Sequence, residues 1–173
     1  DFALVKGKTP TKEALKTFCA PYETRPQASC WSEGWPLYWD QVKQPAGLIH
    51  FCSVLEKGVM RERCYNGMFF IMASQFQLNT EKIIGFCKEI PFPERNRCFA
   101  NGAGRIIETD EKLVAQALMI CAAAVDAGAG DECYDELVMY SKFNFHAGSD
   151  AQRQLCDGLP QKWQTNCGSV SVR

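Results

Sequence analysis

Ten cysteines recur along this chain of 173 residues in five pairs with almost constant spacing. The two cysteines of a pair are 11 or 12 positions apart, and corresponding cysteines of successive pairs are separated by 33 to 35 positions. An apolar residue precedes the first cysteine of each pair, and in four pairs an aromatic residue follows the second. The pairs are Cys19 and Cys30, Cys52 and Cys64, Cys87 and Cys98, Cys121 and Cys133, and Cys156 and Cys167. A fixed period of this length, with helical patterning inside each unit, predicts a stacked array of helical hairpins.

Apolar periodicity defines the repeats. The strongest amphipathic pattern lies in the second repeat, where an i, i+3, i+4, i+7, i+11 spacing is formed by Tyr65, Met68, Phe69, Met72 and Phe76. Five repeats are expected at about residues 9–44, 45–78, 79–108, 109–147 and 148–173. The predicted fold is all-α: a right-handed α-solenoid of about five disulfide-linked αα-hairpins of ~34 residues, within a single helical-repeat domain spanning residues 1–173.

Capping residues and prolines refine this prediction. The first helix of the hairpin is expected to be capped by Thr9 or Thr11 in the first repeat, by Asn79 in the third and by Ser149 in the fifth. A proline-bounded turn is predicted from Pro21 to Pro26, ahead of Cys30. The helix after Cys30 should be interrupted by Gly34 and Pro36 and should resume from Pro36 to Lys43.

The cysteine spacing favours disulfides over metal binding. Each pair flanks a predicted hairpin loop, where two antiparallel helices converge enough for their Cα atoms to lie within the ~7 Å that a disulfide needs. Structural zinc sites use shorter Cys-x(2-4)-Cys spacings, which are absent here, and so is the redox-active Cys-x-x-Cys. Metal thiolates and free buried thiols are the alternatives. Five disulfides imply an oxidising compartment, which predicts a periplasmic or extracellular protein.

Charge and hydropathy exclude several function classes. With 19 basic and 20 acidic residues, the chain has no global field that would recruit nucleic acid or an anionic membrane. No apolar run approaches the ~20 residues of a transmembrane helix, so membrane contact is expected only through a partner. The chain begins with Asp1 and shows no signal peptide, as a processed mature chain or a fragment of a longer array would.

The period of about 34 residues with a cross-linked helical hairpin resembles the tetratricopeptide and Sel1-like repeat class, particularly its secreted cysteine-rich members. The resemblance covers residues 9 to about 167 and lies in period and pairing, because the Trp…Leu-Gly…Tyr pattern of tetratricopeptide repeats is missing. It implies a curved stack of helices that holds peptides or proteins.

Two arginine pairs are candidate partner-binding residues. Arg61 and Arg63 precede Cys64, and Arg95 and Arg97 occupy the same positions before Cys98. If equivalent positions stack, the four arginines form an exposed ladder that suits a carboxylate-bearing partner, because the guanidinium binds carboxylates through two hydrogen bonds. The alternative is salt bridging of Arg95 or Arg97 to the acidic Asp131-Glu132 of the next repeat.

An aromatic cluster in the first repeat is the second candidate partner site. Trp31, Trp35, Tyr38 and Trp39 recur at i, i+4, i+7 and i+8. Core packing of the first hairpin explains this spacing. A partner anchor is the functional alternative, because tryptophan and tyrosine are enriched in interface hot spots.

Other motifs point to structure rather than chemistry. The small residues from Asn101 to Gly104 lack the strand and Lys-Ser/Thr of a phosphate loop, so close helix packing is expected there. The acidic residues after Gly130 begin a helix and compensate its dipole. His50 and His146 form no recognisable catalytic constellation, and no catalytic residue, cofactor or metal site is predicted.

These observations predict a non-enzymatic protein–protein interaction scaffold, a subunit that docks on a larger complex, including one attached to a membrane. One alternative is an enzyme, or its regulator, that acts on glycan or cell-wall material and uses the residues from Trp31 to Trp39 as a sugar platform. A second alternative is a helical protein that stores metal on thiolates.

Overall fold

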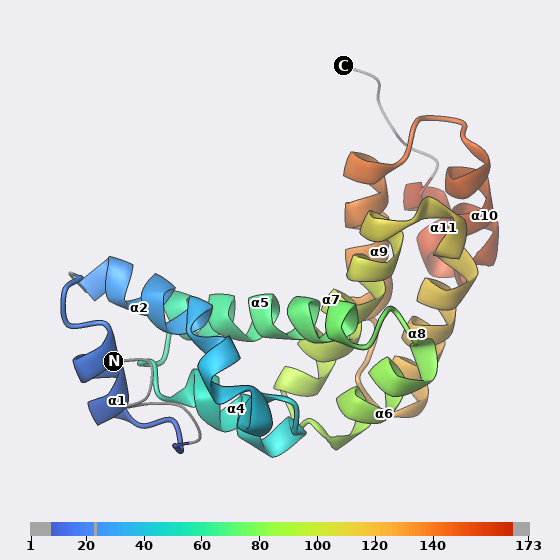
Figure 1. Cartoon of the computed structure of the whole chain (residues 1–173). Coiled ribbons are helices and arrows are strands. Elements are labelled where there is room, and N and C mark those ends of the chain that lie inside the picture. The colour runs from blue at the N-terminus through green and yellow to red at the C-terminus, as the bar shows by residue number, and fades with distance from the viewer. Residues whose placement is uncertain (1–7, 23, 168–173) are drawn as a thin grey trace. The chain divides into compact units, whose positions relative to one another are not determined.

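The computed structural model describes residues 8–22 and 24–167 of the chain. These residues form eleven α-helices and two 3-10 helices and contain no strand, which confirms the all-α fold class (Figure 1). Contacts divide the chain into two compact units, Asp1–Met68 and Phe69–Arg173, and the boundary lies inside one helix, α5. The single domain remains a prediction, and each unit is described separately.

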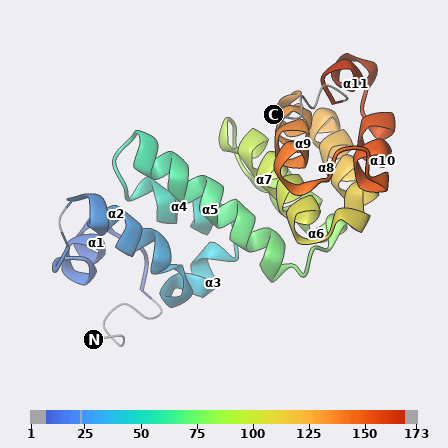
Figure 2. The same cartoon turned by 90° about the horizontal axis from the view of Figure 1, so that it is seen from above.

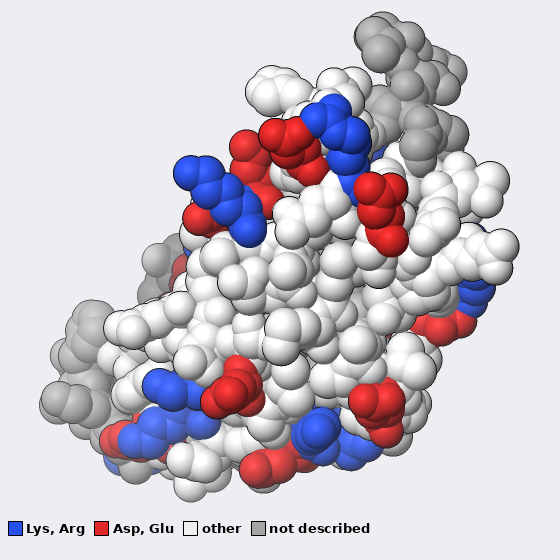
Figure 3. Space-filling model, turned by 90° about the vertical axis from the view of Figure 1, so that its right-hand side faces the viewer, with Lys and Arg blue, Asp and Glu red and all other residues white. Residues whose placement is uncertain are grey.

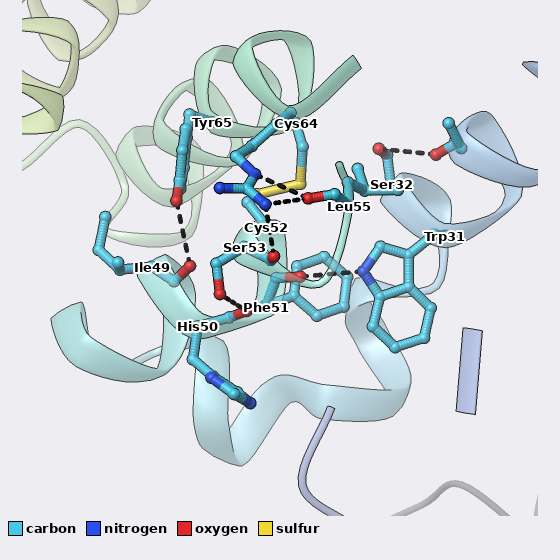
Figure 4. Close-up of a disulfide and its surroundings, with 12 residues drawn as sticks. Trp31, Ser32, Ile49, His50, Phe51, Cys52, Ser53, Leu55, Cys64 and Tyr65 are labelled. Carbon is cyan, nitrogen blue, oxygen red and sulfur yellow. Dashed lines mark hydrogen bonds between the residues drawn. A yellow bond between two sulfur atoms is a disulfide. The ribbon is translucent and has the colours of Figure 1, made fainter. Parts of the chain in front are cut away.

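Unit 1 contains the first two hairpins. Its helices are α1 (Lys12–Phe18), α2 (Thr24–Glu33), the 3-10 helix η2 (Trp35–Tyr38), α3 (Trp39–Val42), α4 (Pro45–Ser53) and the first part of α5 (Val59–Gln75). Its aromatic core is centred on Trp31, which is fully buried and stacks on Phe51 with ring centroids 4.9 Å apart. The indole Nε1 of Trp31 donates a hydrogen bond to the carbonyl of Phe51 (3.0 Å), so its polar group is satisfied as well (Figure 4).

The helix after Cys30 is interrupted where the sequence predicts, but the turn before Cys30 is shorter than expected. Pro36 stands in the first turn of η2, and the regular helix ends at Glu33. The predicted turn to Pro26 is wrong in its extent, because α2 already begins at Thr24. Proline fits the first turn of a helix, where its missing N–H would have no intrahelical acceptor.

Unit 2 contains the second part of α5 and the last three hairpins. Its helices are α6 (Thr80–Glu89), α7 (Glu94–Thr109), the 3-10 helix η3 (Glu111–Leu113), α8 (Val114–Asp126), α9 (Glu132–Asn144), α10 (Asp150–Gly158) and α11 (Gln161–Cys167). Helix α7 packs most closely on α8 and α9 (Figure 2). A Cβ at Gly102 would lie 2.8 Å from Ile83 Cγ2, and one at Gly104 would lie 2.9 Å from Tyr140 Cε2. The small residues of α7 therefore serve close packing, as the sequence predicts.

The predicted caps are present on the first helix of the hairpin in the first, third and fifth repeats. Thr11 Oγ1 accepts a hydrogen bond from Ala14 N–H (3.0 Å), and Asn79 Oδ1 accepts one from Lys82 N–H (2.9 Å). Ser149 Oγ accepts from the N–H three residues later (3.2 Å). The fourth repeat starts slightly later than predicted, because Thr109 still belongs to α7.

All ten cysteines are bonded in the five predicted pairs, and each disulfide joins the first helical segment of a hairpin to the second. The paired Cα atoms are 5.2 to 5.9 Å apart, within the range that the bond requires. Figure 4 shows the second disulfide, between Cys52 and Cys64. Five such bonds indicate that the protein belongs to an oxidising compartment.

The disulfides of the first and last hairpins are expected to be reduced before the other three. Cys30 and Cys156 are half-buried, whereas the remaining eight cysteines are buried. Because thiolate attack requires access to a sulfur atom, limiting reductant should open Cys19–Cys30 and Cys156–Cys167 first. Alkylation of the released thiols under native conditions, followed by peptide mass spectrometry, gives the order. Earlier labelling of Cys87 or Cys98 would contradict the prediction.

Candidate interaction surfaces

Two of the four predicted partner-binding arginines bond to backbone carbonyls of the protein itself, and one of these bonds reaches the next hairpin. Arg61 donates from Nε to the carbonyl of Leu55 (2.7 Å) and from Nη2 to that of Ser53 (2.8 Å), at the C-terminal end of α4 (Figure 4 shows both carbonyls). Arg95 donates from Nε to the carbonyl of Ile90 (2.8 Å) and from Nη1 to that of Ala127 (3.3 Å). Both side chains are half-buried and satisfy carbonyls left free at a helix C-terminus.

The same interaction recurs in four of the five hairpins. A side chain three residues before the second cysteine donates to the carbonyl three residues after the first. The bonds are Gln27 Nε2 to Tyr22 O (2.6 Å), Arg61 Nε to Leu55 O (2.7 Å), Arg95 Nε to Ile90 O (2.8 Å) and Gln164 Nε2 to Leu159 O (2.8 Å). In the fourth hairpin this position is Gly130, and the carbonyl of Ala124 accepts the N–H of Ala129 instead (2.8 Å). The sequence signal for this bond is a long side chain with a hydrogen-bond donor, three residues before the second cysteine.

Arg95→Ala is expected to lower the free energy of unfolding by about 1–3 kcal/mol, because it leaves the carbonyls of Ile90, at the end of α6, and Ala127, at the end of α8, without their charged donor. It also removes the guanidinium that lies 4.4 Å from the Phe92 ring centroid. Arg95→Gln should retain part of the stability, since glutamine makes this bond in two hairpins. Urea denaturation measures the difference. Arg63→Ala, at an exposed arginine, is the matched control, and an equal loss there would contradict this role of Arg95.

The other two arginines differ in exposure. Arg97 is half-buried, and the backbone carbonyl of the same residue accepts the Nδ2 hydrogen of Asn101 (2.8 Å). Arg63 is exposed and lines a groove in unit 1. Of the four predicted arginines, Arg63 therefore combines exposure with a place in a recess.

The groove has a volume of about 1050 Å³. Aromatic and aliphatic side chains from α1, the following turn, η2 and α5 form its walls, and Arg63 and Glu33 supply opposite charges. Its lining residues are Phe18, Tyr22, Ser29, Cys30, Glu33, Gly34, Pro36, Leu37, Met60 and Arg63. Tyr22 is 52 % exposed, so its ring is available to a bound molecule.

The predicted tryptophans do not form one surface. Trp31 belongs to the core of unit 1. Trp35 and Trp39 are half-buried and meet edge to face, with centroids 5.9 Å apart and an interplanar angle of 65°. Neither lines the groove. Sequence reasoning identified Arg63 but missed Phe18, Leu37 and the other groove residues, because they come from segments whose proximity depends on the packing of unit 1.

The acidic start of α9 connects the fourth and fifth hairpins of unit 2. Asp131 forms a salt bridge with Lys162, and Asp135 Oδ1 accepts a hydrogen bond from the indole of Trp163 (2.7 Å). The predicted alternative is a salt bridge of Arg95 or Arg97 with Asp131 or Glu132. In the described part of the chain Arg95 forms no such bridge, since its guanidinium is bound to backbone carbonyls. The N-terminal acids of α9 thus contribute contacts between hairpins as well as dipole compensation.

Glu136 is expected to make stability fall with rising pH. Burial raises the pKa of Glu136, and the negative charge of Glu132 raises this pKa further. The folded protein then holds a proton that the unfolded chain releases, so stability declines from the ordinary pKa of 4.5 up to the raised value. Urea midpoints across this window should decline less in Glu136→Gln than in the parent protein. Parallel profiles would contradict the expectation.

Helix α8 exposes an apolar face in unit 2. From Val114 to Val125 the helix carries no charged residue, and Met119 and Val125 are 58 % and 47 % exposed. Figure 3 shows this side of the molecule with its charged side chains near the edges and an uncharged centre. An exposed apolar face bordered by charged residues is typical of a protein interaction surface.

Comparison of the chain with protein-family models, with curated proteins and with solved structures finds no match. None of the helices in the described residues is long and apolar enough to cross a membrane. Over the same part of the chain, no group of three or more His, Cys, Asp or Glu side chains is arranged to hold a metal ion.

Proposed function

We propose that the protein is a non-enzymatic interaction subunit, periplasmic or extracellular, that binds an extended segment of a partner protein in the unit 1 groove. The groove carries this proposal: its volume of about 1050 Å³, its apolar walls and its two opposite charges match a peptide segment with apolar anchors and charged residues. Arg63 is the residue expected to bind a carboxylate of the partner. The resemblance to tetratricopeptide and Sel1-like repeats supports the same class of function by analogy.

The apolar face of α8 supports a further contact within a larger complex. Exposed apolar side chains such as Met119 gain stability when a partner removes them from water. The five disulfides support an oxidising environment, and the periplasm and the extracellular space are the two oxidising locations that we propose.

Selection of a displayed peptide library on the disulfide-intact protein tests the groove. Peptides that bind are expected to lose about tenfold or more in affinity with Tyr22→Ala or Arg63→Glu, because both side chains line the groove. Phe143→Ala, at a residue 82 % exposed in unit 2, and Lys82→Glu, at an exposed lysine, are the matched controls. Failure to enrich any peptide, or unchanged binding to both groove variants, would reject the proposal.

Glycan binding remains the second candidate, with Trp35 and Trp39 as the aromatic contacts. They are half-buried and adjacent, so a bound sugar should change their fluorescence. Saturable quenching by a glycan that is lost in Trp35→Ala, with peptide selection unsuccessful, would favour this function over the peptide groove.

Storage of metal on thiolates would require reduced cysteines. Thiol titration in denaturant without reductant tests this alternative, because five disulfides leave no reactive thiol.

A further inference from the structure

A second recess in unit 1 combines an aliphatic interior with a basic rim. It has a volume of about 370 Å³ and lies between α1, α2 and the loop that joins α4 to α5. The interior is formed by Leu15, Ala28, Val54, Leu55 and Met60, and Val59, which is 62 % exposed, lies at its mouth. This volume falls in the range of about 300–1,000 Å³ that is usual for small-molecule sites.

The charges around this recess are mainly positive. Lys12 and Lys16 lie one helical turn apart on α1, and Lys57 faces the recess from the loop before α5. Glu56 is the one acidic residue in the lining, so three positive charges are balanced by a single negative charge. Within the described residues none of the three lysines forms a salt bridge.

Helix α5 adds to the positive potential. It is 17 residues long and begins at Val59, which with Met60 lines the recess, so the positive end of its dipole lies there. The basic rim and the helix terminus therefore favour a ligand with a negatively charged group.

The interior favours an alkyl chain over a peptide. No aromatic side chain lines the recess, and two polar groups among its aliphatic side chains are already engaged: Gln27 donates to the carbonyl of Tyr22, and the carbonyl of Leu55 accepts from Arg61. A peptide backbone buried there would leave its polar groups unpaired, which is costly, whereas an alkyl chain needs no hydrogen-bond partner.

We propose that this recess binds a single-chain anionic amphiphile of the fatty-acid type, with the alkyl chain among Leu15, Val54 and Val59 and the carboxylate near the three lysines. The site is separate from the proposed peptide function. Met60 lines both the recess and the groove, so a ligand in one contacts a side chain that also borders the other.

Calorimetric titration of the disulfide-intact protein with dodecanoate, below its micelle concentration, tests the proposal. One molecule of dodecanoate is expected to bind saturably, and native mass spectrometry gives the stoichiometry. Dodecyltrimethylammonium should bind much more weakly, because its head group is positive. Lys12→Gln/Lys16→Gln/Lys57→Gln should weaken dodecanoate binding about tenfold or more, since exposed ion pairs contribute a factor of roughly two to five each. Lys82→Gln/Lys88→Gln, at exposed lysines of unit 2, is the control and should bind as the parent protein does.

A second variant tests the interior without changing charge. Val59→Trp places an indole at the mouth of the recess at a position that is 62 % exposed, so the fold should accept it, and dodecanoate binding should be lost. Val125→Trp, at an exposed valine of α8, should leave binding unchanged. Absence of saturable binding, equal affinity for the cationic amphiphile, or equal binding by both tryptophan variants would overturn the proposal. So would an acidic peptide that binds this recess while dodecanoate does not.

Discussion

Gly47→Ala is expected to lower the free energy of unfolding by about 3 kcal/mol or more, although it adds a single methyl group. Gly47 is the third residue of α4, and a Cβ there would lie 2.0 Å from the carbonyl oxygen of Gln41 and 2.6 Å from its carbonyl carbon. Both atoms belong to the backbone of α3, so rotation of a side chain cannot relieve the clash. The two helices must separate, which disrupts the packing on the adjacent Leu48.

Two helical glycines with open space around them provide the matched controls. A Cβ at Gly67 in α5 or at Gly85 in α6 would meet no atom within 4 Å. Alanine at these positions should therefore raise stability by about 0.5–1 kcal/mol, because alanine loses less backbone entropy than glycine in a helix. Urea denaturation gives the stabilities, and hydrogen exchange of peptides covering α3 and α4 locates the effect. A Gly47→Ala protein as stable as its parent would show that the two helices are not in close contact.

The hairpin architecture could be predicted from the sequence because its determinants are local and repeated. Each pair of cysteines flanks one turn, and a hairpin with a short connection leaves little choice of partner for each sulfur. Thr11 and Asn79 cap helices by bonding to N–H groups three residues away, so their roles can be inferred without knowledge of the packing. The i, i+3, i+4 pattern likewise placed Met68, Phe69 and Met72 in the core.

The surfaces could not be predicted in the same way, because they depend on contacts between segments that are distant in the chain. Arg61 and Arg63 look alike in sequence, yet one satisfies carbonyls at the C-terminal end of α4 and the other lines the groove. Trp31 is of a residue type that is enriched in interface hot spots, but its ring stacks on Phe51, 20 positions later. The requirement for glycine at position 47 arises from the backbone of Gln41, and no pattern in the sequence indicates that contact.

Removal of the Cys87–Cys98 disulfide is the second change with a large expected effect. In the chain-entropy model a cross-link that closes a loop of this length stabilises by about 3 kcal/mol, because it restricts the unfolded chain. Both cysteines are buried, with 1 % and 2 % of their surface exposed, so Cys87→Ala/Cys98→Ala also leaves space in the core between α6 and α7. We expect the double variant to lose about 3–5 kcal/mol in total.

The last hairpin separates these two contributions. Cys156–Cys167 has the same sequence separation of 11, so the loss of cross-link entropy should be the same. Cys156 is half-buried, however, and its removal leaves a smaller cavity. Cys156→Ala/Cys167→Ala should therefore cost about 1 kcal/mol less than Cys87→Ala/Cys98→Ala in urea denaturation. Equal losses would mean that restriction of the unfolded chain accounts for the whole effect, whereas a larger loss at the last hairpin would contradict the role assigned to burial.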